Sequence, residues 1–163
     1  MILVTVGTQF PFDRLVKAMD AWAGDHEDEI FAQIGPARYR PEHFPYVEFT
    51  SPEALQKKTE EADIVVAHAG MGTIISALVL GKPVIVMPRI ASLGEHRNDH
   101  QLATVRKLSQ RFDIEVVNDA QELHAALETL RATNGDAAPL ASTAPDETIT
   151  HLRRLVFNQG TAG

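Results

Sequence analysis

Three short runs of the sequence are apolar at almost every position and rich in valine and isoleucine. They are ILVTV from residue 2, DIVVAH from residue 63 and VIVM from residue 84. A strand with one face in water alternates apolar and polar residues, so a continuous apolar run indicates a strand covered on both faces. Such strands are typical of parallel sheets, in which a helix crosses from each strand to the next. The runs therefore predict an α/β fold.

Further runs and segments complete this pattern. Ser51 offers an N-cap hydroxyl before Pro52, and Gly81 followed by Lys82 and Pro83 ends a helix. A turn-rich stretch at about 133–145 is expected to be a linker. The other expected strands cover residues 29–34, 46–49 and 115–117, and the expected helices start at Asp13 and Pro52 or cover 72–80, 99–110, 120–132 and 146–158.

The length and the order of the elements predict one domain. A chain of 163 residues that is 44% hydrophobic can bury one good core, so we expect a single doubly wound, Rossmann-like parallel sheet over residues 1–163. In such sheets ligands bind outside the carboxyl ends of the strands.

Composition excludes several classes of function. A net charge of −7 disfavours nucleic acid as a partner, and the absence of cysteine excludes disulfides and thiolate metal sites. The seven histidines show no zinc-site spacing, so we expect no metal and no cofactor. No run approaches the roughly 20 apolar residues of a membrane span, which predicts a cytoplasmic chain without a transmembrane segment of its own.

Two glycine turns follow strands and are expected at the same edge of the sheet. Gly7 and Thr8 follow the first strand, and Gly70, Gly72 and Thr73 follow the run that ends at His68. Unpaired amides at a helix start, together with the helix dipole, favour an anion, and a missing Cβ lets a phosphate come close. Both turns are expected at or near helix starts and are candidate diphosphate sites. The alternative is that these glycines only permit tight turns.

A dense polar segment, GEHRNDHQ from residue 94, follows the strand that ends near Pro88. Asp and Gln side chains together donate to and accept from sugar hydroxyls, whereas Arg89 and Arg97 are suited to a phosphate or a sugar carboxylate. The alternative is a solvated loop with a helix N-cap. The candidate binding residues in this segment are Glu95, Arg97, Asn98, Asp99 and Gln101.

These motifs together resemble a known family. The string HAGMGT from residue 68, GKP from residue 81, NDHQ from residue 98 and VGT from residue 6 are similar to the carboxyl-terminal, donor-binding half of GT-B glycosyltransferases of family 28. The resemblance covers about residues 1–131. The longer string MPRIASLGEHRNDHQLAT from residue 87 looks most like bacterial exopolysaccharide subunits that form a split glucuronosyltransferase.

The resemblance implies a UDP-sugar donor and a role for each matching residue. The turn from Gly70 through Met71 and Gly72 to Thr73 would hold the diphosphate, Asp99 and Gln101 would contact the sugar, and Gly7 and Thr8 would face the same cleft. Relatives usually carry an acidic residue for the ribose where this chain has Ser76, which leaves the ribose contact open, since a serine cannot accept from two hydroxyls as a carboxylate does.

The resemblance also implies a partner. Complete relatives have a second, acceptor-binding domain, so we expect this chain to be inactive alone and recruited to the inner face of the membrane by a membrane-associated acceptor-binding subunit. The acceptor would be a lipid-linked sugar and the preferred donor UDP-glucuronate. His68 is a candidate general base, although a histidine at a strand end is more often a structural hydrogen-bonding group, and the partner is the other candidate source of the base.

Two other hypotheses stay open from the sequence. One is a non-catalytic module that binds a nucleotide sugar and regulates a partner. The other is a small stand-alone enzyme that acts on a phosphorylated metabolite. The first predicts UDP binding without turnover, and the second predicts activity from this chain alone.

Overall fold

The computed structural model describes residues 1–97, 105, 109, 112 and 114–133. The predicted helices 99–110 and 146–158, and the linker 133–145 after its first residue, lie wholly or largely outside these residues. The elements, in chain order, are β1 (Ile2–Thr5), α1 (Asp13–Asp25), β2 (Ile30–Gln33), β3 (Tyr46–Val47), α2 (Pro52–Glu61), β4 (Ile64–His68), α3 (Met71–Val79), β5 (Val84–Met87), the 3-10 turn η1 (Ala91–Leu93), β6 (Ile114–Val116) and α5 (Ala120–Ala132).

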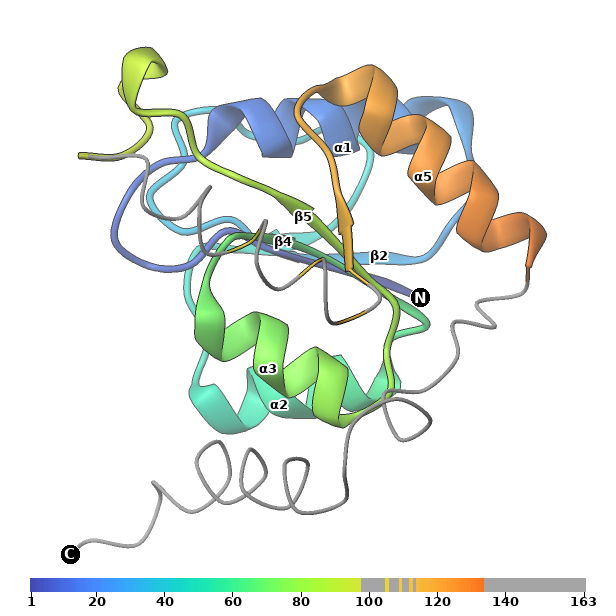
Figure 1. Ribbon diagram of the computed structural model, residues 1–163. Helices are drawn as coiled ribbons and strands as arrows, with labels where there is room; N and C mark the ends of the chain where they lie inside the picture. The colour runs from blue at the N-terminus through green and yellow to red at the C-terminus, as the bar shows by residue number, and fades with distance from the viewer. Residues whose placement is uncertain (98–104, 106–108, 110–111, 113, 134–163) are drawn as a thin grey trace, which may run out of the picture.

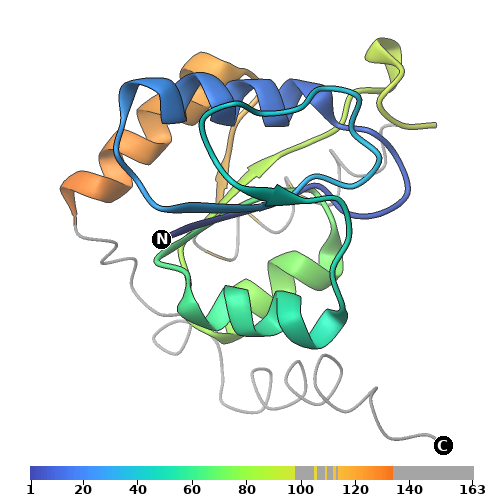
Figure 2. The ribbon, with the colours of Figure 1, turned by 180° about the vertical axis from the view of Figure 1, so that it is seen from behind.

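The six strands form one parallel sheet in the order β3-β2-β1-β4-β5-β6. Helices α1 and α5 cover one face of the sheet, and α2 and α3 cover the other (Figures 1 and 2). Strand order reverses between β1 and β4, which are neighbours in the sheet. The predicted doubly wound α/β fold is confirmed.

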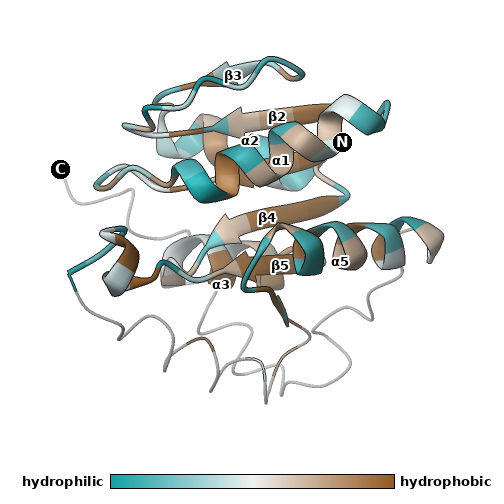
Figure 3. Cartoon of the chain, turned by 90° about the horizontal axis from the view of Figure 1, so that it is seen from above, coloured by the Kyte–Doolittle hydropathy of each residue, from teal (hydrophilic) through white to brown (hydrophobic). Residues whose placement is uncertain are grey.

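The apolar strands supply two cores, one on each face of the sheet. In β1, Ile2 and Val4 pack on the α1 and α5 side, whereas Leu3 packs on the α2 and α3 side. The same alternation holds in β4, where Val66 faces one core and Val65 the other. Side chains of a strand point alternately to its two faces, so a continuous apolar run feeds both cores. The apolar colour of β4 and β5 is visible in Figure 3.

Local signals place most helix ends where the sequence predicts them. The Ser51 hydroxyl accepts a hydrogen bond from the Ala54 amide at 3.2 Å, and Gly81 adopts a left-handed φ of 66° just after α3. Helix α1 begins at Asp13, as the sequence predicts, so a short loop separates the turn of Gly7 and Thr8 from the helix. We call residues 6–12 the β1–α1 loop.

Candidate functional site

A cavity of about 350 Å³ opens at the carboxyl ends of the central strands. It lies at the point where the strand order reverses, which is where open α/β sheets bind ligands. It is lined by Val6, Gly7, Thr8, Gln9, Phe10, His68, Gly70, Gly72, Thr73, Arg89 and His96. Both predicted glycine turns therefore meet at one cavity, although residues 9–69 of the chain separate them.

His68, the last residue of β4, lies between the two glycine turns. A Cβ atom at Gly7 would come within 2.8 Å of the His68 Cε1 atom, and one at Gly70 would collide with Nε2 of the same ring. Gly7 also has a left-handed φ of 76°. These two glycines are thus required by the histidine ring that packs between them, in addition to any close approach of a ligand.

The protonation of His68 is shifted by its surroundings. Burial and, next, the positive charge of Arg89 together lower its pKa from 6.5 to about 4, although the backbone of Thr5 partly opposes this shift. Its Nδ1 atom is buried and has no well-formed hydrogen bond to any described residue. His68 is therefore neutral at pH 7, with its other ring nitrogen, Nε2, at the turn of Gly70.

The start of α3 provides amide groups at the cavity. Gly70 is the N-cap residue, and the first amide that bonds back to it is that of Ile74, at 3.1 Å. The amides of Met71, Gly72 and Thr73 make no hydrogen bond to the described residues. A Cβ at Gly72 would meet nothing within 4 Å. This helix start combines free donors, a favourable dipole and open space, which suits an anion such as a phosphate.

Arg89 lines the cavity, but its guanidinium is bonded to backbone carbonyls and is not free for the expected pairing with a phosphate or carboxylate. The side chain is buried, and its guanidinium donates to the carbonyl oxygens of Val6, Phe10, Pro11 and Glu95. Burial lowers its pKa to about 10, which leaves it charged at pH 7. Direct pairing with a ligand would cost some of these backbone hydrogen bonds.

The carboxylate of Glu95 is likewise bonded to groups of the protein. Its carboxylate accepts a two-pronged contact from Arg14, at 2.8 Å from Nε and 2.9 Å from Nη2, and it accepts from the Ile90 amide at 2.9 Å. Arg14 further donates to the carbonyl of Pro88 at 2.7 Å. This pair ties the segment after β5 to α1, so the structure places Glu95 in a support of the site and not among the cavity-lining residues.

Gln33 is a residue of the site that sequence reasoning missed. It is 2% exposed at the end of β2, and its amide donates to the carbonyls of Gly7 at 3.0 Å and Glu48 at 2.9 Å. Its oxygen accepts from the Thr5 hydroxyl at 2.8 Å. The available signal was a polar side chain at the carboxyl end of a predicted strand, since a buried polar group must find partners.

The remaining candidate residues are placed as follows. Thr8 and Thr73 line the cavity, whereas Met71 is 39% exposed beside it, and Ser76 lies further along α3 and does not line it. Arg97 is exposed, with its guanidinium 5.8 Å from the centre of the cavity-lining Phe10 ring. Asn98, Asp99 and Gln101 lie outside the described residues.

The described residues offer neither a cluster suited to a metal ion nor a helix suited to span a membrane. No group of three or more His, Asp or Glu side chains in this part of the chain is arranged to hold a metal ion. None of its helices has the length and apolarity of a membrane span.

The sequence is similar to a known domain family and to two curated proteins. A model of the glycosyltransferase family 28 C-terminal domain matches residues 1–153. The chain is 30% identical over 118 residues to the human (Homo sapiens) protein "UDP-N-acetylglucosamine transferase subunit ALG13", a match that covers 66% of this chain and 10% of that protein. The mouse (Mus musculus) protein of the same name is 28% identical over 108 residues, which cover 58% of this chain and 9% of that protein. The chain thus spans about a tenth of the length of these relatives.

Solved structures show the same fold at lower identity. An NMR structure of ALG13 aligns with a TM-score of 0.60 at 16% identity and covers 95% of this chain and 94% of that one. The crystal structure of MurG from Acinetobacter baumannii gives a TM-score of 0.63 at 17% identity, over 96% of this chain and 49% of that one. The calicheamicin glycosyltransferase CalG4 gives 0.61 at 15% identity, over 98% and 38%.

Proposed function

The chain belongs to the glycosyltransferase family 28 C-terminal domain family, and from this premise we propose that it is the UDP-sugar-binding catalytic subunit of a two-subunit inverting glycosyltransferase. The observation that carries the proposal is the meeting of both glycine turns and the free amides of α3 at one cavity. The UDP diphosphate would bind the amides of Gly72 and Thr73. These amides would also stabilise the charge that develops on UDP as it leaves.

The source of the general base follows from the pKa of His68. A base works best when its pKa lies near the operating pH, and His68 has a pKa of about 4. It would accept a proton poorly at neutral pH. We therefore assign His68 a binding role toward the donor and assign the base to the partner subunit.

The identity of the sugar is the finer part of the proposal. We propose UDP-glucuronate, because Arg97 is exposed beside the cavity-lining Phe10 and could pair with a carboxylate. Arg89 no longer supports this choice, since its donors bond to carbonyls. UDP-N-acetylglucosamine is the second candidate, because the curated relatives are named for that donor.

A partner subunit is supported by three exposed apolar side chains at the carboxyl edge of the sheet, which we call the apolar rim. Phe49, Met71 and Leu93 follow the carboxyl ends of three different strands, and they are 53%, 39% and 60% exposed. Large apolar side chains exposed at one edge of a sheet are suited to a surface that another protein covers. We propose that an acceptor-binding, membrane-associated subunit docks on this rim, that it brings a lipid-linked acceptor, and that it recruits the chain to the inner face of the membrane.

The first test is calorimetric titration of the purified chain with UDP, UDP-glucuronate, UDP-N-acetylglucosamine, UDP-glucose and ADP. Selective binding of uridine ligands that is lost in Gly72→Asp would support the proposal. A preference for ADP would overturn it. Activity of the chain alone on a phosphorylated metabolite would favour the stand-alone enzyme, and UDP binding without turnover beside a competent partner would favour the regulatory module.

Replacing Arg97 tests the sugar. If Arg97 pairs with the glucuronate carboxylate, Arg97→Ala should lower the affinity for UDP-glucuronate by about tenfold, in line with the loss of a charge-assisted hydrogen bond. The affinity for UDP should fall by at most about twofold. Arg40→Ala is the matched control, because Arg40 is exposed and pairs with Glu48 at 2.6 Å. Equal losses for both ligands in Arg97→Ala would remove the argument for glucuronate.

A further inference from the structure

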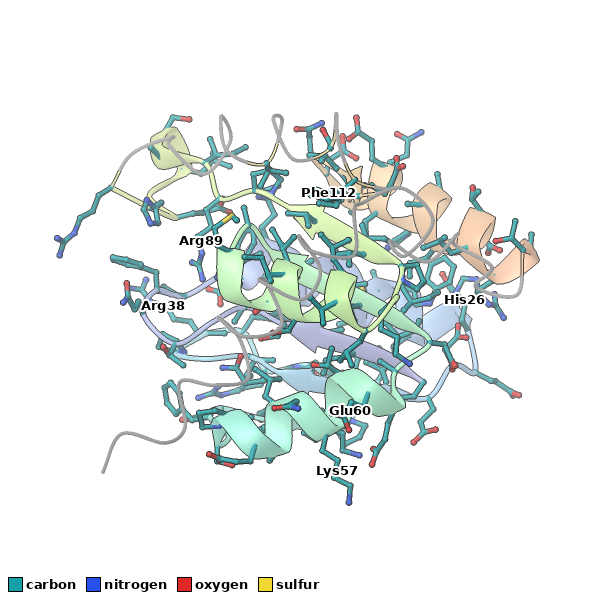
Figure 4. The ribbon with its side chains drawn as sticks, turned by 60° about the horizontal axis from the view of Figure 1, so that its bottom comes forward. His26, Arg38, Lys57, Glu60, Arg89 and Phe112 are labelled. Carbon is teal, nitrogen blue, oxygen red and sulfur yellow. The ribbon has the colours of Figure 1, made fainter. Side chains whose placement is uncertain are left out.

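We propose that Arg89 is a positioning residue that holds the β1–α1 loop by the carbonyl groups of Val6, Phe10 and Pro11, so that the amides of Gly7 to Phe10 stay free for a ligand in the cavity. The role of those amides rests on the proposed function, whereas the bracing of the loop does not. Figure 4 shows Arg89 and Arg38 at the same end of the molecule, with His26 at the opposite end.

Arg89 contacts three carbonyl groups of the β1–α1 loop, those of Val6, Phe10 and Pro11. Nη2 donates to the carbonyls of Val6 at 2.6 Å and Phe10 at 2.8 Å, and Nη1 donates to that of Pro11 at 2.6 Å. The guanidinium also lies 4.7 Å from the centre of the buried Phe12 ring. One side chain thus contacts the loop at its first residue and at its last three residues.

A second side chain takes the next carbonyl group. The amide of Gln33 donates to the Gly7 carbonyl at 3.0 Å, from the other side of β1. By contrast, the amides of the loop residues Gly7 to Phe10 make no hydrogen bond to the described residues. These residues line the cavity. The carbonyls of Gly7 and Phe10, at the two ends of this segment, are thus bonded to the protein, whereas its amides are unoccupied. Such a run of unoccupied amides is suited to an anion, as in a backbone nest.

This task suits arginine and not lysine. The guanidinium carries five donors in a planar fork, so it can reach several fixed carbonyls at once. The ammonium of lysine is a compact point charge on a flexible stem and cannot span them. Both residues would supply a positive charge. Arg89→Lys therefore keeps the positive charge but loses the hydrogen bonds that hold the loop, so it tests the two effects separately.

Charge adds a second effect in the same direction. No carboxylate forms a salt bridge with Arg89 within the described part of the chain, because the Glu95 carboxylate is taken up by Arg14. Within the described part of the chain the guanidinium of Arg89 donates to backbone carbonyls alone, and the Glu95 carboxylate favours its charge without forming a salt bridge with it. The charge lies beside the cavity, where an anion would supply a further countercharge.

The experiment compares wild type, Arg89→Lys and the control Arg131→Lys, which makes the same change on α5, away from the cavity. Backbone order parameters of the Gly7 to Phe10 amides are measured by NMR relaxation without ligand, and UDP affinity by calorimetry. We expect values of about 0.85 in wild type and the control, and below about 0.6 in Arg89→Lys. We also expect Arg89→Lys to lose UDP affinity by about tenfold or more, because the loop must then be ordered on binding.

The other outcomes are decisive as well. A rigid loop in Arg89→Lys overturns the bracing, and a flexible loop with unchanged UDP affinity overturns the role of its amides. If wild type fails to bind UDP, the proposed function fails, while the order parameters still decide the bracing. If Arg89→Lys does not fold, the side-chain NMR signals of Arg89 in wild type are read instead. Slow rotation and protected Nη protons support the contacts, and rapid averaging overturns them.

Discussion

At the scale of single residues, Gly70 and Gly72 lack a side chain for different reasons. The space next to Gly70 is filled by the His68 ring, whereas the space next to Gly72 is open. A side chain at position 70 is thus excluded by the packing of the protein itself. On the proposed function, a side chain at position 72 is excluded because the ligand needs the space.

This difference predicts opposite behaviour for two alanine substitutions. Gly70→Ala should lower the free energy of unfolding by about 1–3 kcal/mol, the usual cost of overpacking. Gly72→Ala should leave it unchanged or raise it by up to about 1 kcal/mol, since alanine favours a helix. UDP affinity should nevertheless fall by about tenfold in Gly72→Ala, because the methyl group occupies the ligand's space. Urea unfolding and calorimetry measure both quantities.

A double mutant tests the cause of the Gly70 effect. If the His68 ring is the obstacle, Gly70→Ala should lower the free energy of unfolding by less than about 0.5 kcal/mol in a His68→Ala background, where the ring is absent. An unchanged cost in that background would contradict the packing explanation.

The buried ring of His68 predicts a pH dependence of stability. Its pKa is lowered from 6.5 to about 4 by burial first and then by Arg89, so the unfolded chain binds the proton more readily. The free energy of unfolding should fall by up to about 3 kcal/mol as the pH drops from 6.5 to 4. Above 6.5 this histidine should contribute no slope. Urea midpoints across this range should show the loss in wild type and a smaller loss in His68→Gln.

At the scale of elements, helices α1 and α5 are joined by a contact at their far ends. His26 follows α1, stacks on the Trp22 ring with 3.6 Å between ring centroids, and lies 3.0 Å from the Glu128 carboxylate of α5. Arg131 of α5 lies over the same Trp22 ring at 5.7 Å. These contacts support the α1 and α5 layer from the end opposite the cavity (Figure 4).

This contact predicts a pH dependence of the opposite sign to that of His68. The pKa of His26 is raised, first by the Trp22 carbonyl and further by Glu128, although burial partly opposes the rise. Its protonation should therefore stabilise the fold below about pH 6.5, and this stabilisation should be lost as the pH rises through the raised value. NMR titration should show a lower His26 pKa in Glu128→Gln. The exposed neighbour Glu27 gives the control, Glu27→Gln, which should leave the His26 pKa within about 0.2 of wild type.

At the scale of the whole molecule, a ligand that binds only the folded chain must raise its stability. UDP at about 100 times its dissociation constant should add about 2.7 kcal/mol to the free energy of unfolding. The thermal midpoint should rise with UDP concentration in wild type and stay constant in Gly72→Asp, where a carboxylate would repel the diphosphate. The same rise in both proteins would place UDP somewhere other than the cavity.

The sequence by itself determined the layout of the described chain. The strands at residues 2, 63 and 84, the helix start at Ser51, the helix stop at Gly81 and the doubly wound sheet all rest on signals between near neighbours, such as apolar runs and capping residues. The meeting of the two glycine turns also follows, because parallel strands bring their carboxyl ends to one edge.

Only the tertiary structure decided how the polar residues are used. Arg89 donates to the carbonyl of Val6, 83 positions away, and Arg14 pairs with Glu95, 81 positions away. Gly70 owes its missing side chain to the position of a ring, and Gln33 owes its place to the carbonyl of Gly7. Residue type and spacing show that such a group can bind an anion or a carbonyl, but the choice between a ligand and the protein's own backbone depends on which partner the folded chain brings within about 3 Å.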